Sequence, residues 1–194
     1  ESVATTYSWN TGTTSSSISV TPAFTTLYTV TGTTSACSGL RTSTVTVNAL
    51  PTVTATNNGP VCAGNSVTLT STSATSYTWS GPSGFNSINQ NPVIASTSSL
   101  NAGTYTLTIT GANTCTNVTT TALAINALPS VSSNTAAICS GAGSVTLTAT
   151  GATTYTWNTG ATTTAIVVSP PVTTNYTVTG TNGIGCRNSY TTTV

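Results

Sequence analysis

The sequence predicts an all-β protein built from tandem antiparallel β-sandwich domains. Thr, Ser and Asn make up 95 of the 194 residues, while hydrophobic residues make up 37%, so the chain is polar without being ionic. Apolar and hydroxyl-bearing residues alternate over short segments such as 67–70 and 104–110, and a period of two is typical of strands with one buried face. The same landmarks recur along the chain, which indicates that the sandwich is repeated.

Charge is nearly absent, because Glu1, Arg41 and Arg187 are the only charged residues and the chain has no Asp, Lys, His or Met. No acid or base is therefore available to activate the many hydroxyl groups, which excludes catalysis. Metal sites need clustered carboxylates, imidazoles or thiolates, so we expect neither a metal nor another cofactor. Two arginines cannot neutralise a phosphate backbone, which excludes nucleic acid as a partner.

Two sequence tags define the repeat. Thr-Thr-Tyr-Ser-Trp-Asn-Thr-Gly at 5–12 returns with one change at 153–160, and Asn-Ala-Leu-Pro at 48–51 returns at 126–129, a spacing of 78 residues. Periods of this size correspond to whole small domains in series. We predict a first repeat that lacks its early strands, a complete second repeat and a nearly complete third repeat, at residues 1–50, 51–128 and 129–194.

Each repeat carries a Trp followed by a Tyr in an alternating strand, and we expect these aromatic residues to form the structural core. The residues are Trp9, Trp79, Trp157, Tyr28, Tyr105 and Tyr176. Gly103-Thr104-Tyr105 at the start of a late strand is similar to a tyrosine corner, and the preceding Trp takes the place of the core Trp of strand C. The predicted sandwiches are therefore immunoglobulin-like.

The second repeat contains an insertion, since the interval from Trp to Tyr is 26 residues there and 19 in the other two repeats. The insertion lies around residues 81–91 and contains Phe85 and Asn86, which we take as candidates for a glycan- or protein-binding loop. Phe24 is the other Phe off the repeat pattern. The alternative is a loop of neutral length variation. Outward threonines at 104, 106, 108 and 110 suggest a third candidate, binding to ice or another surface.

The five cysteines include no Cys-x-x-Cys pair and have no His beside them, so we expect disulfides and a secreted or cell-surface location. The spacing pairs Cys62 with Cys115 and Cys139 with Cys186, one bridge inside each complete repeat. Cys37 is then left over, and its partner lies upstream or in another chain. No apolar run is long enough for a membrane-spanning helix.

The first repeat leaves two alternatives open. Either the sequence is a segment of a longer array, or the first domain is completed by a strand from another copy. We favour the longer array, because the first repeat lacks two strands and a cysteine whereas the third repeat has no spare segment to donate.

Three motifs carry a resemblance to a known family. They are Cys-x-Gly-x-Ser-Val-Thr-Leu-Thr at 62–70 with its shorter copy at 144–148, Tyr-x-Trp-Asn-x-Gly at 7–12 and 155–160, and Tyr-Thr-Val-Thr-Gly at 28–32 and 176–180. Tandem units of this form resemble the Ig-like or PKD-like repeats of very large Bacteroidota cell-surface proteins exported by the type IX system, including gliding-motility adhesins. PKD loops usually carry acids that are absent at 157–160, so the resemblance implies no calcium site.

The resemblance implies a structural role, as a stalk or filament segment of a repetitive surface adhesin. Leu-Pro linkers would stiffen its joints, because proline fixes φ and removes a donor. Strand edges without Lys or Asp and a net charge near zero favour association of the sandwiches. We therefore expect self-association into head-to-tail arrays or filaments.

Overall fold

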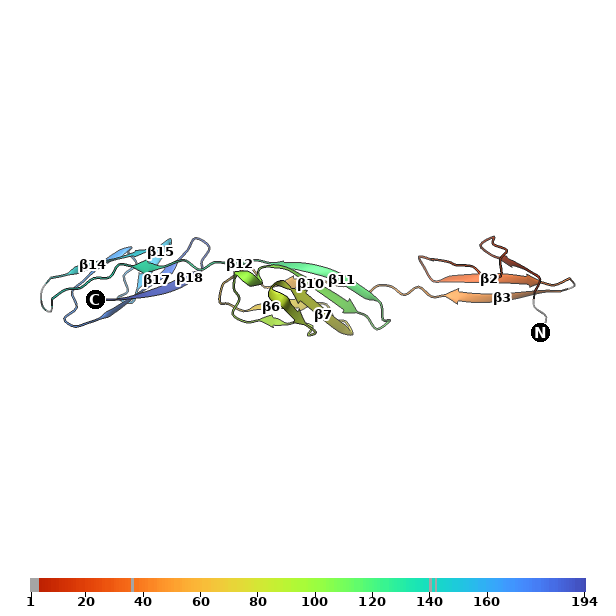
Figure 1. The fold of residues 1–194 in the computed structure, drawn as a ribbon, viewed down its shortest axis with the longest axis horizontal. Coiled ribbons are helices and arrows are strands. Elements are labelled where there is room, and N and C mark those ends of the chain that lie inside the picture. The colour runs from red at the N-terminus through yellow and green to blue at the C-terminus, as the bar shows by residue number, and fades with distance from the viewer. Residues whose placement is uncertain (1–3, 36, 140, 142) are drawn as a thin grey trace.

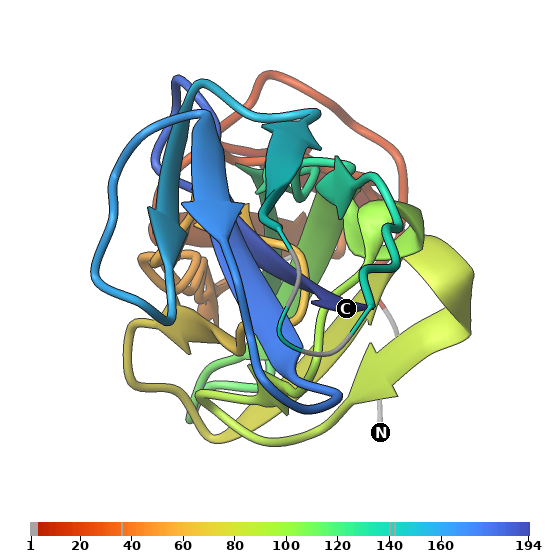
Figure 2. The same ribbon diagram turned by 90° about the vertical axis from the view of Figure 1, so that its left-hand side faces the viewer.

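The computed structural model describes residues 4–35, 37–139, 141 and 143–194. Sheets of short strands follow one another along a single long axis, with the two chain ends toward opposite ends of the molecule (Figure 1). In the end-on view the repeats lie one behind another (Figure 2). Glu1 lies outside the described residues. The prediction of an all-β chain with antiparallel sheets is confirmed.

The third repeat is a sandwich of two three-stranded antiparallel sheets. One sheet has the order β13 (Ser132–Ser133), β14 (Val145–Thr150), β16 (Ala165–Val168). The other has the order β15 (Thr154–Trp157), β17 (Asn175–Thr181), β18 (Arg187–Thr193). In chain order these strands correspond to A, B and E in one sheet and C, F and G in the other, which is the immunoglobulin arrangement, with no strand D among the described residues.

The second repeat has the same two layers, with one extra strand from the insertion. Its first sheet has the order β4 (Ala55–Asn57), β6 (Val67–Ser71), β9 (Val93–Ile94). The other has the order β11 (Thr116–Leu123), β10 (Gly103–Thr110), β7 (Ser76–Gly81), β8 (Phe85–Ser87). Two 3-10 turns, η1 (Pro82–Gly84) and η2 (Ser99–Asn101), flank this sheet.

The hydroxyl of Tyr105 identifies the tyrosine corner of the second repeat. It donates a hydrogen bond to the carbonyl oxygen of Asn101 at 2.8 Å, four residues upstream. This is the bond that marks the E–F corner of immunoglobulin sandwiches. Together with the strand order, it confirms the immunoglobulin-like fold.

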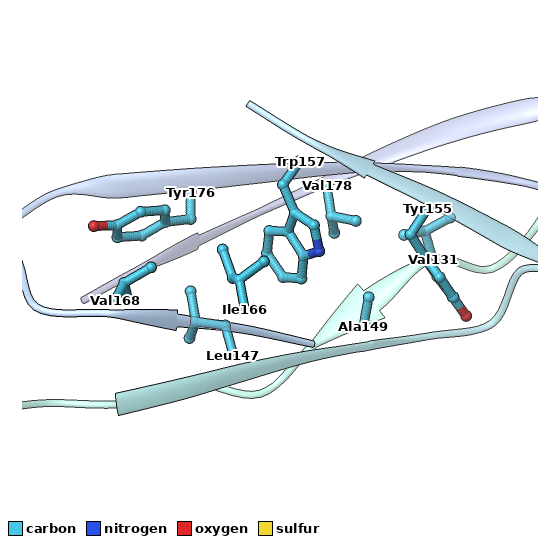
Figure 3. Close-up of a cluster of buried hydrophobic side chains, with 9 residues drawn as sticks. All are labelled: Val131, Leu147, Ala149, Tyr155, Trp157, Ile166, Val168, Tyr176 and Val178. Atoms are coloured by element: carbon cyan, nitrogen blue, oxygen red, sulfur yellow. The ribbon is translucent and has the colours of Figure 1, made fainter. Parts of the chain in front are cut away.

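The buried side chains come from the apolar positions of the alternating strands. Figure 3 shows Trp157 reaching from the C, F, G sheet toward Leu147 and Ile166 of the opposite sheet. Trp79 is fully buried in the second repeat. Each indole also finds a carbonyl acceptor farther along the chain, because a buried N–H must be paired. Trp157 Nε1 donates to Thr163 at 3.0 Å and Trp79 Nε1 to Gln90 at 3.3 Å.

The Trp-Asn-Thr-Gly tag is a turn that also holds strand F. The amide of Asn158 donates to the carbonyl of Asn175 and accepts from the N–H of Thr177, both at 3.3 Å. Gly160 has φ of 87°, and its N–H bonds back to the Trp157 carbonyl at 2.9 Å. A positive φ favours glycine. The tag therefore recurs because it joins strands C and F, and an acidic residue is not needed for that purpose.

The described residues of the first repeat form one sheet, β1 (Thr6–Trp9), β2 (Thr26–Thr33) and β3 (Ser38–Val45). Its apolar face forms a shallow hollow of about 150 Å³ lined by Trp9, Ile18, Val20, Tyr28, Ser43 and Val45. In the third repeat β14 covers the matching face. Among the described residues, no strand covers it in the first repeat.

This difference predicts unequal effects of the same substitution at the two equivalent Trp positions. Trp157→Ala removes a buried ring and should cost roughly 3–5 kcal/mol of stability in the third repeat. Trp9→Ala should cost less than half of that, because Trp9 is only half-buried. Hydrogen exchange of the β17 and β2 amides in the two variants measures each loss separately. Equal losses would contradict the uncovered face of the first repeat.

A second prediction concerns alkaline pH. Burial raises the pKa of Tyr105 above its usual value of 10.0. The stabilisation that depends on the protonated Tyr105 is therefore complete below about pH 10 and is lost as the pH rises through the folded-state pKa. Urea unfolding of the wild type and of Tyr105→Phe at pH 8 and pH 11 should show a stability difference that shrinks at the higher pH. A stability difference that is the same at both pH values would contradict a raised pKa of Tyr105.

Candidate functional site: the joint between repeats

The exit end of the second repeat holds Cys62 beside the last strand. The short strands β5 (Val61–Cys62) and β12 (Ile125–Asn126) pair in parallel, with Cys62 opposite Asn126. The N–H of Ala63 bonds to the Asn126 carbonyl at 2.9 Å. Asn126 is followed by the first residue of the Ala-Leu-Pro linker. The pairing of β5 with β12 therefore places Cys62 at the joint between the second and third repeats.

The hairpin between β17 and β18 brings Cys186 to the same joint. The side chain of Asn182 accepts a hydrogen bond from the Cys186 N–H at 2.9 Å and donates one to the Ala127 carbonyl at 3.1 Å. One amide thus fixes the buried Cys186 against the linker. Cys62 and Cys186 form a disulfide with their Cα atoms 5.6 Å apart. The bond joins the second repeat to the third.

The expected pairing of Cys62 with Cys115 is wrong. Cys62 lies opposite Asn126, and Cys115 precedes that residue by 11 positions along β11 and β12. At about 3.3 Å per residue, the two cysteines are ~35 Å apart along the strand, whereas a disulfide needs Cα atoms within about 7 Å. The number of residues between two cysteines does not show at which end of the sandwich each one lies. The interval alone therefore led to the wrong pairing.

The expected pairing of Cys139 with Cys186 is wrong for the same reason. Cys139 follows Ile138, which lines a hollow with Val194 at the far end of the third repeat. Cys186 immediately precedes β18 at the near end, so the length of that strand separates the two. In the described part of the chain Cys37, Cys115 and Cys139 are free thiols.

Two asparagine side chains bind each linker to the repeat that follows it, and we call them the amide clamp. At the second linker, Asn182 binds the Ala127 carbonyl and Asn188 binds the Pro129 carbonyl at 3.0 Å. At the first linker, Asn113 binds the Ala49 carbonyl at 2.8 Å and Asn117 binds the Pro51 carbonyl at 2.9 Å. Linker carbonyls that the β-ladders leave unpaired therefore have donors from side chains.

A sequence motif accompanies the amide clamp, but the spacing of the cysteines alone does not reveal it. Both clamped repeats carry Cys-x-Asn at the start of the last strand, at 115–117 and 186–188. The first repeat has Cys37-Ser38-Gly39 at the same place. The motif therefore marks repeats whose last hairpin holds a preceding linker.

The two joints differ by the disulfide. The Cys115 N–H bonds to the Asn113 side chain at 3.2 Å, so Cys115 has the position at the first joint that Cys186 has at the second. In the described part of the chain Cys115 is a free thiol, whereas Cys186 is bonded to Cys62. Within the described residues no group of three or more His, Cys, Asp or Glu side chains could hold a metal.

The binding-loop candidates of the insertion lie partly in the sandwich. The Phe85 ring packs edge-on against Tyr105, with centroids 5.4 Å apart and an interplanar angle of 75°. The Asn86 amide donates to the Gly84 carbonyl at 3.0 Å. Ile88 is the large apolar residue that the loop exposes, at 79%. Phe24 in the first repeat is 82% exposed.

The aromatic residues assigned to the core have different exposures. Trp79, Trp157, Tyr105, Tyr28 and Tyr176 are buried, whereas Trp9 is half-buried.

Threonines on the outer sheet faces bond across strands, as between Thr177 and Thr191 at 2.8 Å. Such pairs stabilise neighbouring strands.

Comparison with known proteins gives structural matches only. No family model matches the chain, and no curated protein matches its sequence. Solved structures with similar folds include murine CEACAM1b (13% identity, TM-score 0.37, covering 72% of this chain and 97% of that chain). Others are the extracellular domains 3–5 of Drosophila OTK (13%, 0.40, 87% and 70%) and a 1.5-MDa bacterial ice-binding adhesin (18%, 0.38, 86% and 72%). At these values the matches say nothing of what this chain binds.

In the part of the chain that the structure describes, no helix has the length and apolar character needed to cross a membrane.

Peptide mapping under non-reducing conditions tests the disulfide at the joint. With free thiols alkylated before digestion, we expect one linked pair, containing Cys62 and Cys186, and alkylated Cys115 in every preparation of the monomer. Cys62→Ser should release Cys186 as an alkylated peptide. Recovery of Cys62 linked to Cys115, or of Cys139 linked to Cys186, would refute the joint described above.

Proposed function

We propose that the chain is a non-enzymatic segment of an extracellular rod, the stalk or filament of a repetitive surface adhesin, in which each sandwich is a spacer. The observation that carries the proposal is that a disulfide, in addition to the linker, connects the second and third repeats. The linker and the Cys62–Cys186 disulfide attach the second repeat to the third at two separate points. A sandwich attached by one flexible linker can swing, whereas two attachments and the amide clamp restrict the angle between repeats.

The size of the closed loop supports a stabilising role for the bond. The cysteines are 124 positions apart in the sequence. In the chain-entropy model, closing a loop of this length stabilises the folded state by about 5 kcal/mol. The bond therefore raises the stability of both repeats at once, and the repeat boundaries at 50/51 and 128/129 define the spacers between joints.

The chemistry of the surface fits an extracellular location at a cell surface. Disulfide bonds such as Cys62–Cys186 form and persist in oxidising compartments. Hydroxyl and amide groups rather than charges solvate the sheets, so salt and moderate pH changes alter few interactions. The motif resemblance to Bacteroidota adhesins exported by the type IX system supports membership of such an array, and the uncharged strand edges support association of rods side by side.

A binding role for residues 81–91 is the second candidate, and the exposure of Ile88 favours it. Phe85 contributes little to that role, because its ring packs on Tyr105. Unchanged adhesion after replacement of Ile88 by Ser would remove this candidate.

The first joint is an internal control for the stiffness of the second, since it has the amide clamp without the disulfide. Electron microscopy of single molecules should show a narrower distribution of angles at the second joint than at the first. Cys62→Ser, or reduction, should widen the second distribution until it matches the first, and Cys115→Ser should change neither. Equal distributions in the oxidised wild type would overturn the proposed rod.

A further inference from the structure

We propose that Asn182 is a modification site, where the side-chain amide is lost in a reaction with the backbone of Gly183 and a carboxylate is left at the joint. The reaction is spontaneous deamidation through a cyclic succinimide, with water as the co-reactant. The site goes beyond the proposed rod, because the reaction needs only the hairpin between β17 and β18. Its consequence is that the linker loses one of the two bonds of the amide clamp.

Gly183 leaves the backbone beside the Asn182 amide open. The nitrogen that attacks the Asn182 side chain belongs to the next residue, and a side chain on that residue would crowd the approach. Glycine has no Cβ, and a Cβ atom placed on Gly183 would meet no atom within 4 Å. Among the described residues no acceptor takes the Gly183 N–H. Neither packing nor a hydrogen bond therefore holds this nitrogen back.

Two N–H groups activate the side-chain carbonyl that is attacked. Asn182 Oδ1 accepts hydrogen bonds from the Ile184 N–H at 3.2 Å and the Cys186 N–H at 2.9 Å. When the Gly183 nitrogen adds to Cγ, negative charge develops on Oδ1, and donors already directed at that oxygen stabilise it. The bond to the N–H two residues on is that of an Asx turn, so the side chain folds back over the Gly183 peptide.

The reaction consumes one water and needs no oxidant. Hydroxide takes the proton of the Gly183 N–H, the nitrogen forms a bond to Asn182 Cγ, and the side-chain nitrogen leaves as ammonia with a proton from water. Water then adds to one of the two carbonyl carbons of the succinimide ring and breaks its bond to the Gly183 nitrogen, which takes back a proton. Breaking the bond to Cγ gives aspartate, and breaking the bond to the main-chain carbon gives isoaspartate.

The product changes the two bonds that the Asn182 amide makes at the joint. A carboxylate still accepts from the Cys186 N–H, but it has no N–H for the Ala127 carbonyl, to which the amide donates at 3.1 Å. The carboxylate and carbonyl oxygens repel each other instead. Arg187 lies opposite Thr181 in the β17–β18 ladder, one position from the new charge, and attracts it. The modification therefore releases this bond of the clamp and leaves the disulfide in place.

Asn113 at the first joint is an internal control, because it makes the same kinds of bond without the glycine. It accepts from the Cys115 N–H and donates to the Ala49 carbonyl. Thr114 follows it, and the Thr114 N–H is bonded to the Gly111 carbonyl at 3.0 Å. A β-branched side chain and a hydrogen bond thus both hinder the nitrogen that would attack Asn113.

Asn58 is a second control, because it precedes a glycine that is closed off. The Gly59 N–H donates to Asn57 Oδ1 at 2.9 Å. A Cβ placed on Gly59 would lie 2.8 Å from the Leu123 side chain. The chain therefore carries the Asn-Gly dipeptide in one protected and one open setting, and we expect the open one to react.

Peptide mapping of the full chain during incubation in mildly alkaline buffer tests the site. Aspartate and isoaspartate should accumulate at position 182 at least about tenfold faster than at positions 58 and 113, a barrier difference of about 1.4 kcal/mol. Gly183→Ala should slow the change at 182 by a similar factor. Gly39→Ala is the matched control at another open glycine and should leave the rate at 182 unchanged.

Equal rates at 182 and 113 in the folded protein would overturn the proposal, as would an unchanged rate in Gly183→Ala. Incubation in urea isolates the contribution of the fold. There the rate at 58 should rise to that at 182, because neither glycine is then covered. A rate at 182 that is much lower in the folded chain than in urea would show that the hairpin protects the amide, and would also reject the site.

The effect on the joint is measured by reduction of the disulfide. Cys186 is fully buried, so a thiol reductant reaches the bond when the joint opens. Loss of one hydrogen bond shifts such an equilibrium by roughly fivefold. Asn182→Asp should therefore speed reduction by that factor, and Asn113→Asp should not. An unchanged rate would reject the release of the linker.

These readouts are independent of the rod proposal, which is tested by the angles at the two joints. Narrow angles at the second joint together with a stable amide at 182 would reject the modification site alone. Rapid deamidation at 182 with equal angles at both joints would reject the rod alone.

Discussion

Backbone groups outside the β-ladders need hydrogen-bond partners, and asparagine side chains supply many of them in this chain. One amide can donate and accept at once, so Asn158 holds strand F, Asn134 holds strand β14, and Asn182 holds both a linker and a cysteine. No buried side-chain nitrogen or oxygen of the described residues lacks a partner. The chain can therefore lose nearly all its charges and still satisfy its interior.

The position of the disulfide depends on this arrangement. Asn182 orients the hairpin of the third repeat, and the pairing of β5 with β12 orients Cys62. Each cysteine is held by its own repeat, and the Ala127 carbonyl accepts a hydrogen bond from Asn182, which connects the linker to the third repeat. The bond therefore stabilises a joint that hydrogen bonds already position.

The fold could be predicted from the sequence because alternation and the Trp and Tyr landmarks report burial directly. The pairing of the cysteines could not, since an interval of 53 residues from Cys62 to Cys115 gives no information on the end of the sandwich at which each lies. Only strand order shows that these two are at opposite ends. The amide clamp could be predicted only in part. The Cys-x-Asn motif is visible in the sequence, but the carbonyl groups that accept the hydrogen bonds belong to the linker before the repeat.

The joint disulfide also decides which residues carry tension. When the chain is pulled from its two ends, the covalent path runs from Cys62 directly to Cys186, and the 124-position segment between them is bypassed. That segment could otherwise lengthen the molecule by about 430 Å at ~3.5 Å per residue. Unfolding of the third repeat core would then add no length while the bond is intact. The intact disulfide therefore limits how far this chain can be stretched, and reduction of the bond makes the same chain extensible.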